Sequence, residues 1–125
     1  MKIVIADDNR DSADSMAMLL GAFGHDVHVA YDGNQAVAKV DEIKPDVVLL
    51  DIGMPGMDGY ECARAIRTRE WAAKTLLIAL TGWGQDEDKR RALEAGFDRH
   101  LTKPVDPVLL EGALRPPQAG QDGRP

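Results

Sequence analysis

The chain has 125 residues, of which 44% are hydrophobic and 29% charged, which is enough for one domain with a core covered on two sides. Its net charge of −6 argues against direct binding to nucleic acid, which usually needs a basic face. The sequence shows no apolar run long enough for membrane insertion and no signal-peptide pattern, and its single cysteine, Cys62, cannot form an internal disulfide. We therefore expect a cytoplasmic protein.

Short apolar runs predict the strands of a parallel sheet. The runs at 3–6, 47–50 and 76–80 are continuous, as in central strands that are covered on both faces. The segment 27–31 alternates and carries a polar residue, which indicates an edge strand. A further short strand is expected around 99–101.

Amphipathic segments between these strands predict helices. The first covers about Asn9 to Phe23, the second starts near Gly33, and the last is expected at about 107–114, after the cap residue Asp106. The charged run 86–91 is interpreted as a solvated face of the fourth helix rather than as a dedicated site.

Two helix starts carry the spacing of a capping box. Asp32 is followed three residues later by Gln35, and Asp58 is followed in the same way by Glu61. The second and third helices are therefore expected to begin directly after Asp32 and Asp58.

Five strands thus alternate with five helices, which predicts an α/β fold with a doubly wound, five-stranded parallel sheet. The strand order 2-1-3-4-5 would place the first and third strands side by side at a switch point, where such folds bind ligands. We expect this domain to cover residues 1–115. Residues 116–125 lack apolar periodicity and are interpreted as a disordered tail or a linker stub.

Polar residues stand where the predicted strands end. Asp7 and Asp8 follow the first strand, Asp51 the third, Thr81 the fourth and Lys103 the fifth. The carboxyl ends of parallel strands share one edge, so these side chains should converge there. Crowded carboxylates repel one another, and a hard cation such as Mg²⁺, which prefers oxygen ligands, resolves this conflict. Asp51 could then accept a phosphoryl group, while Lys103 and Thr81 contact its oxygens.

These features resemble the receiver domain of response regulators in two-component signalling, over residues 1–115. The resemblance implies a flavodoxin-like receiver fold, Mg²⁺ as cofactor, a histidine kinase or histidine phosphotransfer protein as phosphodonor, and a downstream protein target. The matching motifs are Asp7-Asp8, Asp51 within Val-Val-Leu-Leu-Asp-Ile-Gly-Met-Pro-Gly-Met-Asp-Gly, Leu80-Thr81-Gly82, Ala95-Gly96 and Lys103-Pro104.

The resemblance also implies a role for each acidic residue. Asp51 would be the phosphoacceptor. Asp8, Asp51 and the carbonyl of Gly53 would bind Mg²⁺, and Asp7 would assist through water.

On the phosphate side, the resemblance implies that Thr81 follows the phosphate and that Lys103 contacts it, with a cis peptide before Pro104. Many receivers carry Tyr or Phe as a switch three residues before this lysine, whereas this chain has His100. Two interpretations stay open for His100: a switch coupled to Thr81, or a half-exposed edge-strand residue without a switching role.

Two neighbours of the site are candidates for tuning the lifetime of the aspartyl phosphate. Gly53, two residues after Asp51, offers no side chain to guide or block water. Trp83, two residues after Thr81, is large, and could instead contact a partner or pack within its loop.

The leading hypothesis is a phosphoacceptor signalling domain, not an enzyme with a separate substrate. Two alternatives are a Mg²⁺-dependent phosphatase with an aspartyl nucleophile and a receiver-like interaction module that is never phosphorylated. Gly53 stands where a phosphatase would be expected to carry a second carboxylate, and the intact Asp8, Asp51, Thr81 and Lys103 argue against the module. The sequence leaves open whether the domain stands alone or belongs to a hybrid histidine kinase, and whether it forms a homodimer.

Overall fold

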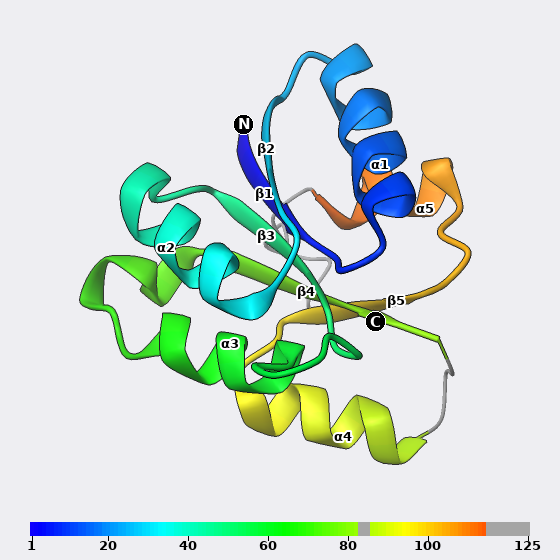
Figure 1. Cartoon of the computed structure of the whole chain (residues 1–125). Helices are drawn as coiled ribbons and strands as arrows, with labels where there is room; N and C mark the ends of the chain where they lie inside the picture. Colours follow the sequence, from blue (N-terminus) through cyan, green and yellow to red (C-terminus); the bar gives the residue numbers. More distant parts are fainter. Residues whose placement is uncertain (83–85, 115–125) are drawn as a thin grey trace, which may run out of the picture.

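The computed structural model describes residues 1–82 and 86–114. Within them, five parallel strands form one sheet in the order β2-β1-β3-β4-β5, which confirms the predicted fold class (Figure 1). The predicted edge strand is β2, at one border of the sheet, and β5 forms the other border. The strands are β1 (Lys2–Ala6), β2 (Asp26–Ala30), β3 (Val47–Asp51), β4 (Leu76–Thr81) and β5 (Arg99–Thr102).

Helices cover both faces of this sheet, as a doubly wound topology requires (Figure 1). On one face lie α1 (Arg10–Ala22) and α5 (Pro107–Ala113). On the other face lie α2 (Gly33–Ile43), α3 (Gly59–Arg67) and α4 (Asp86–Ala95). The continuous apolar runs of the central strands follow from this arrangement, because neighbouring residues of one strand face opposite helix layers.

The core is accordingly divided into two clusters by the sheet. In β1, Ile3 and Ile5 pack under α1 and α5, whereas Val4 and Ala6 pack under α2 and α3. All four side chains are fully buried. Burial of each large aliphatic side chain contributes about 1.5–3 kcal/mol, so the strand ends are held firmly in register.

Helix caps set the start of α3 and α2. Asp58 and Glu61 form the predicted capping box: Glu61 N donates to Asp58 Oδ1 at 2.9 Å, and Asp58 N donates to Glu61 Oε1 at 3.3 Å. The second box is only half formed. Asp32 Oδ1 accepts from Gln35 N at 2.8 Å, but Gln35 Oε1 accepts from Tyr31 N, one residue before the cap.

A short 3-10 helix, η1 (Glu70–Lys74), was not expected from the sequence. It connects α3 to β4, and the partly buried Trp71 packs from it against the α2–α3 side of the core. Cys62 is fully buried in α3, and its Sγ lies 3.6 Å from the Gly33 carbonyl oxygen.

One arginine joins several segments at the end of α3. Arg67 Nε donates to Gly96 O at 2.9 Å, and its Nη1 donates to Ala72 O at 2.8 Å and to Thr75 O at 2.9 Å. Its Nη2 lies 2.7 Å from Asp98 Oδ2. A single guanidinium thereby fixes α3, η1 and the turn between α4 and β5.

No helix in the part of the chain that the structure describes is both long and apolar enough to cross a membrane. Trp83 and the segment 116–125, for which the sequence led to specific expectations, lie outside the described residues.

Candidate functional site

The polar residues that follow the strands converge at one edge of the sheet. Lys103 Nζ lies 3.0 Å from Asp7 Oδ2 and 3.2 Å from Asp51 Oδ2, so the ends of β1, β3 and β5 meet at this ammonium. Thr81 ends β4, which lies between β3 and β5, and its carbonyl oxygen accepts from Lys103 N at 2.7 Å. The structure therefore brings these four sequence-predicted residues together. The Lys103-Pro104 peptide beside them is cis.

Backbone N–H groups orient two of the carboxylates. Asn9 N donates to Asp7 Oδ1 and Gly53 N donates to Asp51 Oδ1, each at 3.0 Å and each from two residues further along the chain. Asn9 also caps α1 by accepting from Ser12 N at 3.1 Å. The turns that leave β1 and β3 thus fix one oxygen of each carboxylate and leave the other facing Lys103.

Asp7, Asp8 and Asp51 form a group of carboxylates that could hold a metal ion. One oxygen from each lies within 4.8 Å of the others. Asp7 is 1% exposed, whereas Asp8 is exposed to solvent, so the group is anchored on one side and accessible on the other. An all-oxygen donor set of this kind suits Mg²⁺, which keeps several water ligands beside one or two carboxylates.

The charges in the site perturb each other. Burial raises the pKa of the Asp7 carboxyl, and the neighbouring Asp51 adds to this, while the N–H of Asn9 and the Lys103 ammonium oppose it. Burial works to lower the pKa of Lys103, but the carboxylates of Asp7 and Asp51 outweigh it and raise that pKa above its ordinary value. The single positive charge of Lys103 does not neutralise the charge of the three carboxylates, so a further cation would be favourable here.

The hydroxyl of Thr81 is the second unsatisfied feature of the site. Thr81 is 2% exposed, and its Oγ1 has no hydrogen-bond partner among the described residues. A buried hydroxyl without a partner costs about 1–3 kcal/mol, so a ligand oxygen placed beside it would recover that cost.

Glycine allows the start of α3 to lie directly against the end of β3. A Cβ atom on Gly59 would lie 2.6 Å from Ile52 Cα and 2.8 Å from the Asp51 carbonyl oxygen. The first residue of α3 must therefore lack a side chain. This contact holds the backbone of Asp51 between its strand and the helix.

Two cavities flank the site on opposite faces of the sheet, and both are bordered by Lys103 and Gly82. The cavity on the α1–α5 side has a volume of about 640 Å³. Its lining includes Asp7, Ser12, Met16, Leu19 and Val105. The cavity on the α3–α4 side has a volume of about 470 Å³. Its lining includes Asp51, Gly53, Asp58, Tyr60 and Arg91.

The structure places His100 on β5, opposite Ala79 of β4, and half-buried. Among the described residues, no hydrogen bond joins its ring to Thr81. The coupling of His100 to Thr81 stays a prediction.

Arg91 borders the candidate site, which the sequence did not indicate. It lies within the charged run interpreted as a solvated face, yet it borders the cavity that contains Asp51, and its guanidinium lies over the Tyr60 ring. Arg91 is exposed, as that interpretation expects, and it reaches the cavity because α4 packs beside α3.

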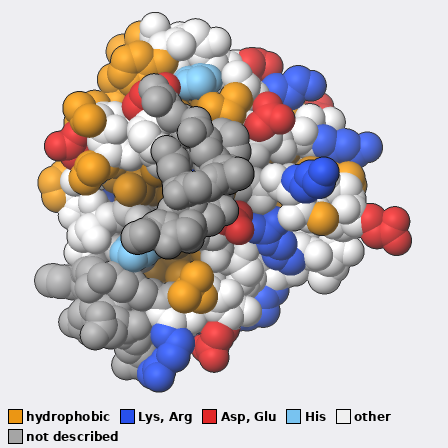
Figure 2. Space-filling model, turned by 180° about the vertical axis from the view of Figure 1, so that it is seen from behind, with side chains coloured by type: hydrophobic (Ala, Val, Ile, Leu, Met, Phe, Trp, Pro, Cys, Tyr) orange, Lys and Arg blue, Asp and Glu red, His pale blue; other side chains and the backbone are white. Residues whose placement is uncertain are grey.

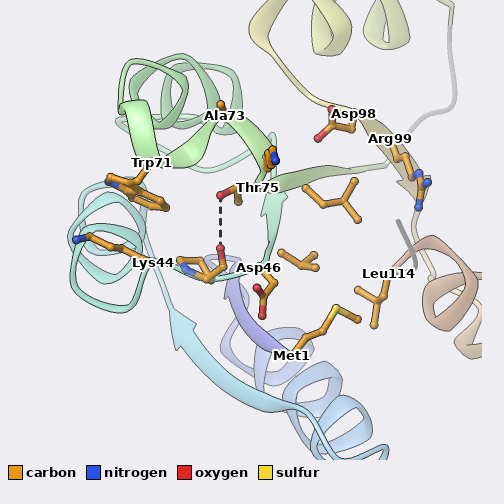
Figure 3. Close-up of a pocket in the computed structure, with 13 residues that line it drawn as sticks. Met1, Lys44, Asp46, Trp71, Ala73, Thr75, Asp98, Arg99 and Leu114 are labelled. Atoms are coloured by element: carbon orange, nitrogen blue, oxygen red, sulfur yellow. Dashed lines mark hydrogen bonds between the residues drawn. The ribbon is translucent and has the colours of Figure 1, made fainter. Parts of the chain in front are cut away.

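A larger cavity, of about 880 Å³, lies at the opposite edge of the sheet (Figure 3). Trp71 and Lys44 stand on one side of it and Leu114 and Met1 on the other (Figure 3). Thr75, which also lines it, donates through Oγ1 to the Pro45 carbonyl oxygen at 3.4 Å (Figure 3). The carboxylate group is at the other end of the strands, so this cavity is separate from the candidate site.

Comparison with known proteins finds receiver domains and response regulators. The family model of the response regulator receiver domain matches residues 3–115. The chemotaxis protein CheY4 of Vibrio cholerae is 30% identical, with a TM-score of 0.87, over 90% of this chain and 94% of that one.

Receiver domains of histidine kinases are similarly close. The receiver domain of sensor histidine kinase PA1611 from Pseudomonas aeruginosa has a magnesium ion coordinated in its active-site cleft. It is 31% identical, with a TM-score of 0.83, over 90% of this chain and 93% of that one. The receiver domain of a signal transduction histidine kinase from Syntrophus aciditrophicus is 29% identical, with a TM-score of 0.82, over 90% and 86% of the two chains. With the family match, the strand order and the carboxylate edge in agreement, the chain belongs to the response regulator receiver domains of two-component signalling.

Proposed function

We propose that Asp51 is the phosphoacceptor of this receiver domain and that it takes a phosphoryl group from a phosphohistidine on a histidine kinase or histidine phosphotransfer protein. One observation carries the proposal: Asp51 shares an edge with the Lys103 ammonium and the unpartnered Thr81 hydroxyl. A carboxylate, a cation and a free hydroxyl donor at one point suit phosphoryl transfer, which depends on positioning and charge neutralisation.

The transfer needs only the carboxylate of the chain, the phosphohistidine of the donor and one proton from solvent. An Asp51 carboxylate oxygen forms a P–O bond as the P–N bond to the donor imidazole breaks, and the leaving imidazole takes a proton from solvent. Lys103 would neutralise charge on the phosphoryl oxygens, and Thr81 would donate its hydroxyl hydrogen to one of them.

Asp8, Asp51 and the Gly53 carbonyl would hold Mg²⁺, with Asp7 assisting through water. Bound there, the ion would supply positive charge that reduces the repulsion between the carboxylates and the incoming phosphoryl group. The all-oxygen group and the magnesium ion in the PA1611 receiver domain support this assignment.

The donor protein would approach from the side of α1 and α5. The cavity there reaches Asp7 and Lys103, and its walls include apolar residues of both helices. On the same two helices, the side chains of Met18, Val108 and Leu109 are 78%, 79% and 63% exposed. Seen from behind, the molecule shows apolar side chains gathered on the side of these two helices, while basic groups lie mainly on the other side (Figure 2).

The proposal also covers the conformational change on phosphorylation and the lifetime of the aspartyl phosphate. Phosphorylation would shift an existing equilibrium between two conformations of the face that binds the downstream target, with His100 as a candidate switch residue. Gly53 would tune the lifetime of the aspartyl phosphate. Among the described residues, a Cβ on Gly53 would meet only Asp51 Oδ1, at 3.6 Å, so Gly53→Ala should fold normally and allow the lifetime to be compared with that of the wild type.

The central test is phosphorylation by acetyl phosphate with Mg²⁺, followed by intact-protein mass spectrometry. We expect one added phosphoryl mass in the wild type, none in Asp51→Asn, and none in the wild type with EDTA. A phosphoryl mass that persists in Asp51→Asn would place the phosphate elsewhere. Continuous release of inorganic phosphate from phosphate monoesters would instead support a phosphatase.

A further inference from the structure

Arg91 is held at the rim of the cavity on the α3–α4 side of Asp51. Its guanidinium carbon lies 4.5 Å from the centre of the Tyr60 ring, within the range of a cation–π contact. Tyr60 is 5% exposed, and its ring meets that of Phe97 edge-on with centroids 6.5 Å apart. The ring is therefore a fixed platform, and Arg91 rests on it.

No further contact of the guanidinium is found in the part of the chain that the structure describes. Among the described residues, Arg91 makes no hydrogen bond or ion pair, whereas Arg67 and Arg69 each bind a carboxylate. An arginine held by an aromatic ring keeps its N–H groups available for a planar, two-oxygen acceptor. Asp58 borders the same cavity, but its Oδ1 is already used to cap α3.

The charge balance of the site shows what acceptor would fit. Lys103 already contacts two carboxylates, at 3.0 and 3.2 Å. A phosphoryl group on Asp51 would replace the single negative charge of the carboxylate with about two negative charges at neutral pH. Lys103 stands on one side of Asp51, and Arg91 borders the cavity on the α3–α4 side.

We propose that Arg91 binds phosphoryl oxygens at Asp51, both during transfer and in the phosphorylated protein. The Tyr60 ring would hold the Arg91 guanidinium at the rim of the cavity before the phosphoryl group arrives. The inference rests on the proposed role of Asp51. It adds a second cation, from α4, to the Lys103 contact. It also means that helix α4 takes part in phosphate binding through a side chain of its own.

The chain offers a matched control for this role. Arg90 is the neighbouring residue on α4, is exposed, and is not among the described residues that border the cavity. Arg91→Ala and Arg90→Ala change the net charge equally, so long-range electrostatics cannot separate them. Arg91→Lys keeps the charge but not the planar fork.

The experiment measures the second-order rate constant for phosphorylation of Asp51 by acetyl phosphate and by phosphoramidate at fixed Mg²⁺. It also measures the half-life of the phosphorylated protein after the donor is removed. Arg91→Ala should lower the rate constant about five- to tenfold with both donors, as expected for one lost charge-assisted contact. Arg91→Lys should lie between Arg91→Ala and the wild type, and Arg90→Ala should stay within about twofold.

Two further measurements separate phosphate binding from a structural role. The Mg²⁺ concentration at half-saturation should be the same in Arg91→Ala and Arg90→Ala, and the thermal midpoint of unphosphorylated Arg91→Ala should be lower only by the small amount expected for the lost cation–π contact with Tyr60. Equal rate constants for these two variants would overturn the inference. So would a loss of rate in Arg91→Ala that is accompanied by weaker Mg²⁺ binding and a midpoint lowered by more than this amount, because Arg91 would then only join α3 to α4. A wild type that accepts no phosphate would instead refute the proposed function, and this inference with it.

Discussion

Replacement of Arg67 by alanine should destabilise the domain more than any neighbouring surface substitution. Its guanidinium makes four hydrogen bonds, to Gly96 O, Ala72 O, Thr75 O and Asp98 Oδ2, at 2.7 to 2.9 Å. The Asp98 oxygen also accepts from Leu77 N, at 2.9 Å, so the network reaches the beginning of strand β4.

The size of the effect follows from these contacts. Hydrogen bonds to charged groups contribute about 1.5–3 kcal/mol each when buried, but the Arg67 side chain is 22% exposed and water can replace part of the loss. We therefore expect about 3–4 kcal/mol for Arg67→Ala, a large fraction of the roughly 5–15 kcal/mol that stabilises a typical domain. Arg67→Lys should lose more than half of this, because one ammonium cannot reach four separate acceptors.

Arg69 provides the comparison. It forms a two-bond pair with Asp41, at 2.8 Å for both bonds, on a surface where Asp41 is 42% exposed. The Arg69 guanidinium lowers the pKa of Asp41, but such surface pairs contribute only about 0–1 kcal/mol. Urea unfolding at neutral pH, followed by tryptophan fluorescence, gives both values. A loss for Arg67→Ala no greater than that for Arg69→Ala would refute the reasoning.

Three other predictions concern the site and the core. Folding raises the pKa of Asp7, so the Mg²⁺-free protein loses stability as pH rises through that pKa. Asp7→Asn should therefore have a higher melting temperature than the wild type at neutral pH in EDTA. Calorimetry should show this difference vanish in acid, and a lower melting temperature of Asp7→Asn at neutral pH would contradict the prediction. Burial raises the pKa of Cys62 to about 12, so the native thiol should resist a disulfide reagent at pH 8 and react only in denaturant; rapid native labelling would contradict this. Gly59→Ala should lower the free energy of unfolding by about 1–3 kcal/mol and slow phosphorylation of Asp51, because the added Cβ would press on the Asp51 carbonyl. Gly21→Ala is the control: no heavy atom of the described residues lies within 4 Å of its added Cβ, so the change should be neutral or stabilising by up to about 1 kcal/mol. Equal stabilities of the two variants would disprove the contact.

Much of the fold could be predicted because its signals are local. Central strands such as 47–50 are continuous apolar runs, and the Asp58–Glu61 box needs only residues three positions apart. The convergence of Asp51 and Lys103 was also predictable, since it follows from parallel topology once the strands are known. In each case the physical cause lies within a few residues or in the strand order.

The rest depends on contacts between distant segments. Arg67 reaches Gly96, 29 residues away, and nothing near Arg67 in the sequence marks it as different from Arg69. Arg91 reaches the cavity only because α4 packs beside α3, which brings it over Tyr60. The 3-10 turn η1 carries no apolar period, so its sequence predicted only a connection.

The ion pair between Lys103 and Asp7 joins residues 96 positions apart and so closes almost the whole chain into one loop. Loops of this length close late, because the entropy of closure grows with loop length and non-local contacts slow folding. During synthesis, the acidic residues Asp7, Asp8 and Asp51 leave the ribosome long before Lys103 does. The charged cluster of Asp7, Asp51 and Lys103 can therefore form only after β5 has joined the sheet, so the last strand of the sheet completes the site that the first strand begins.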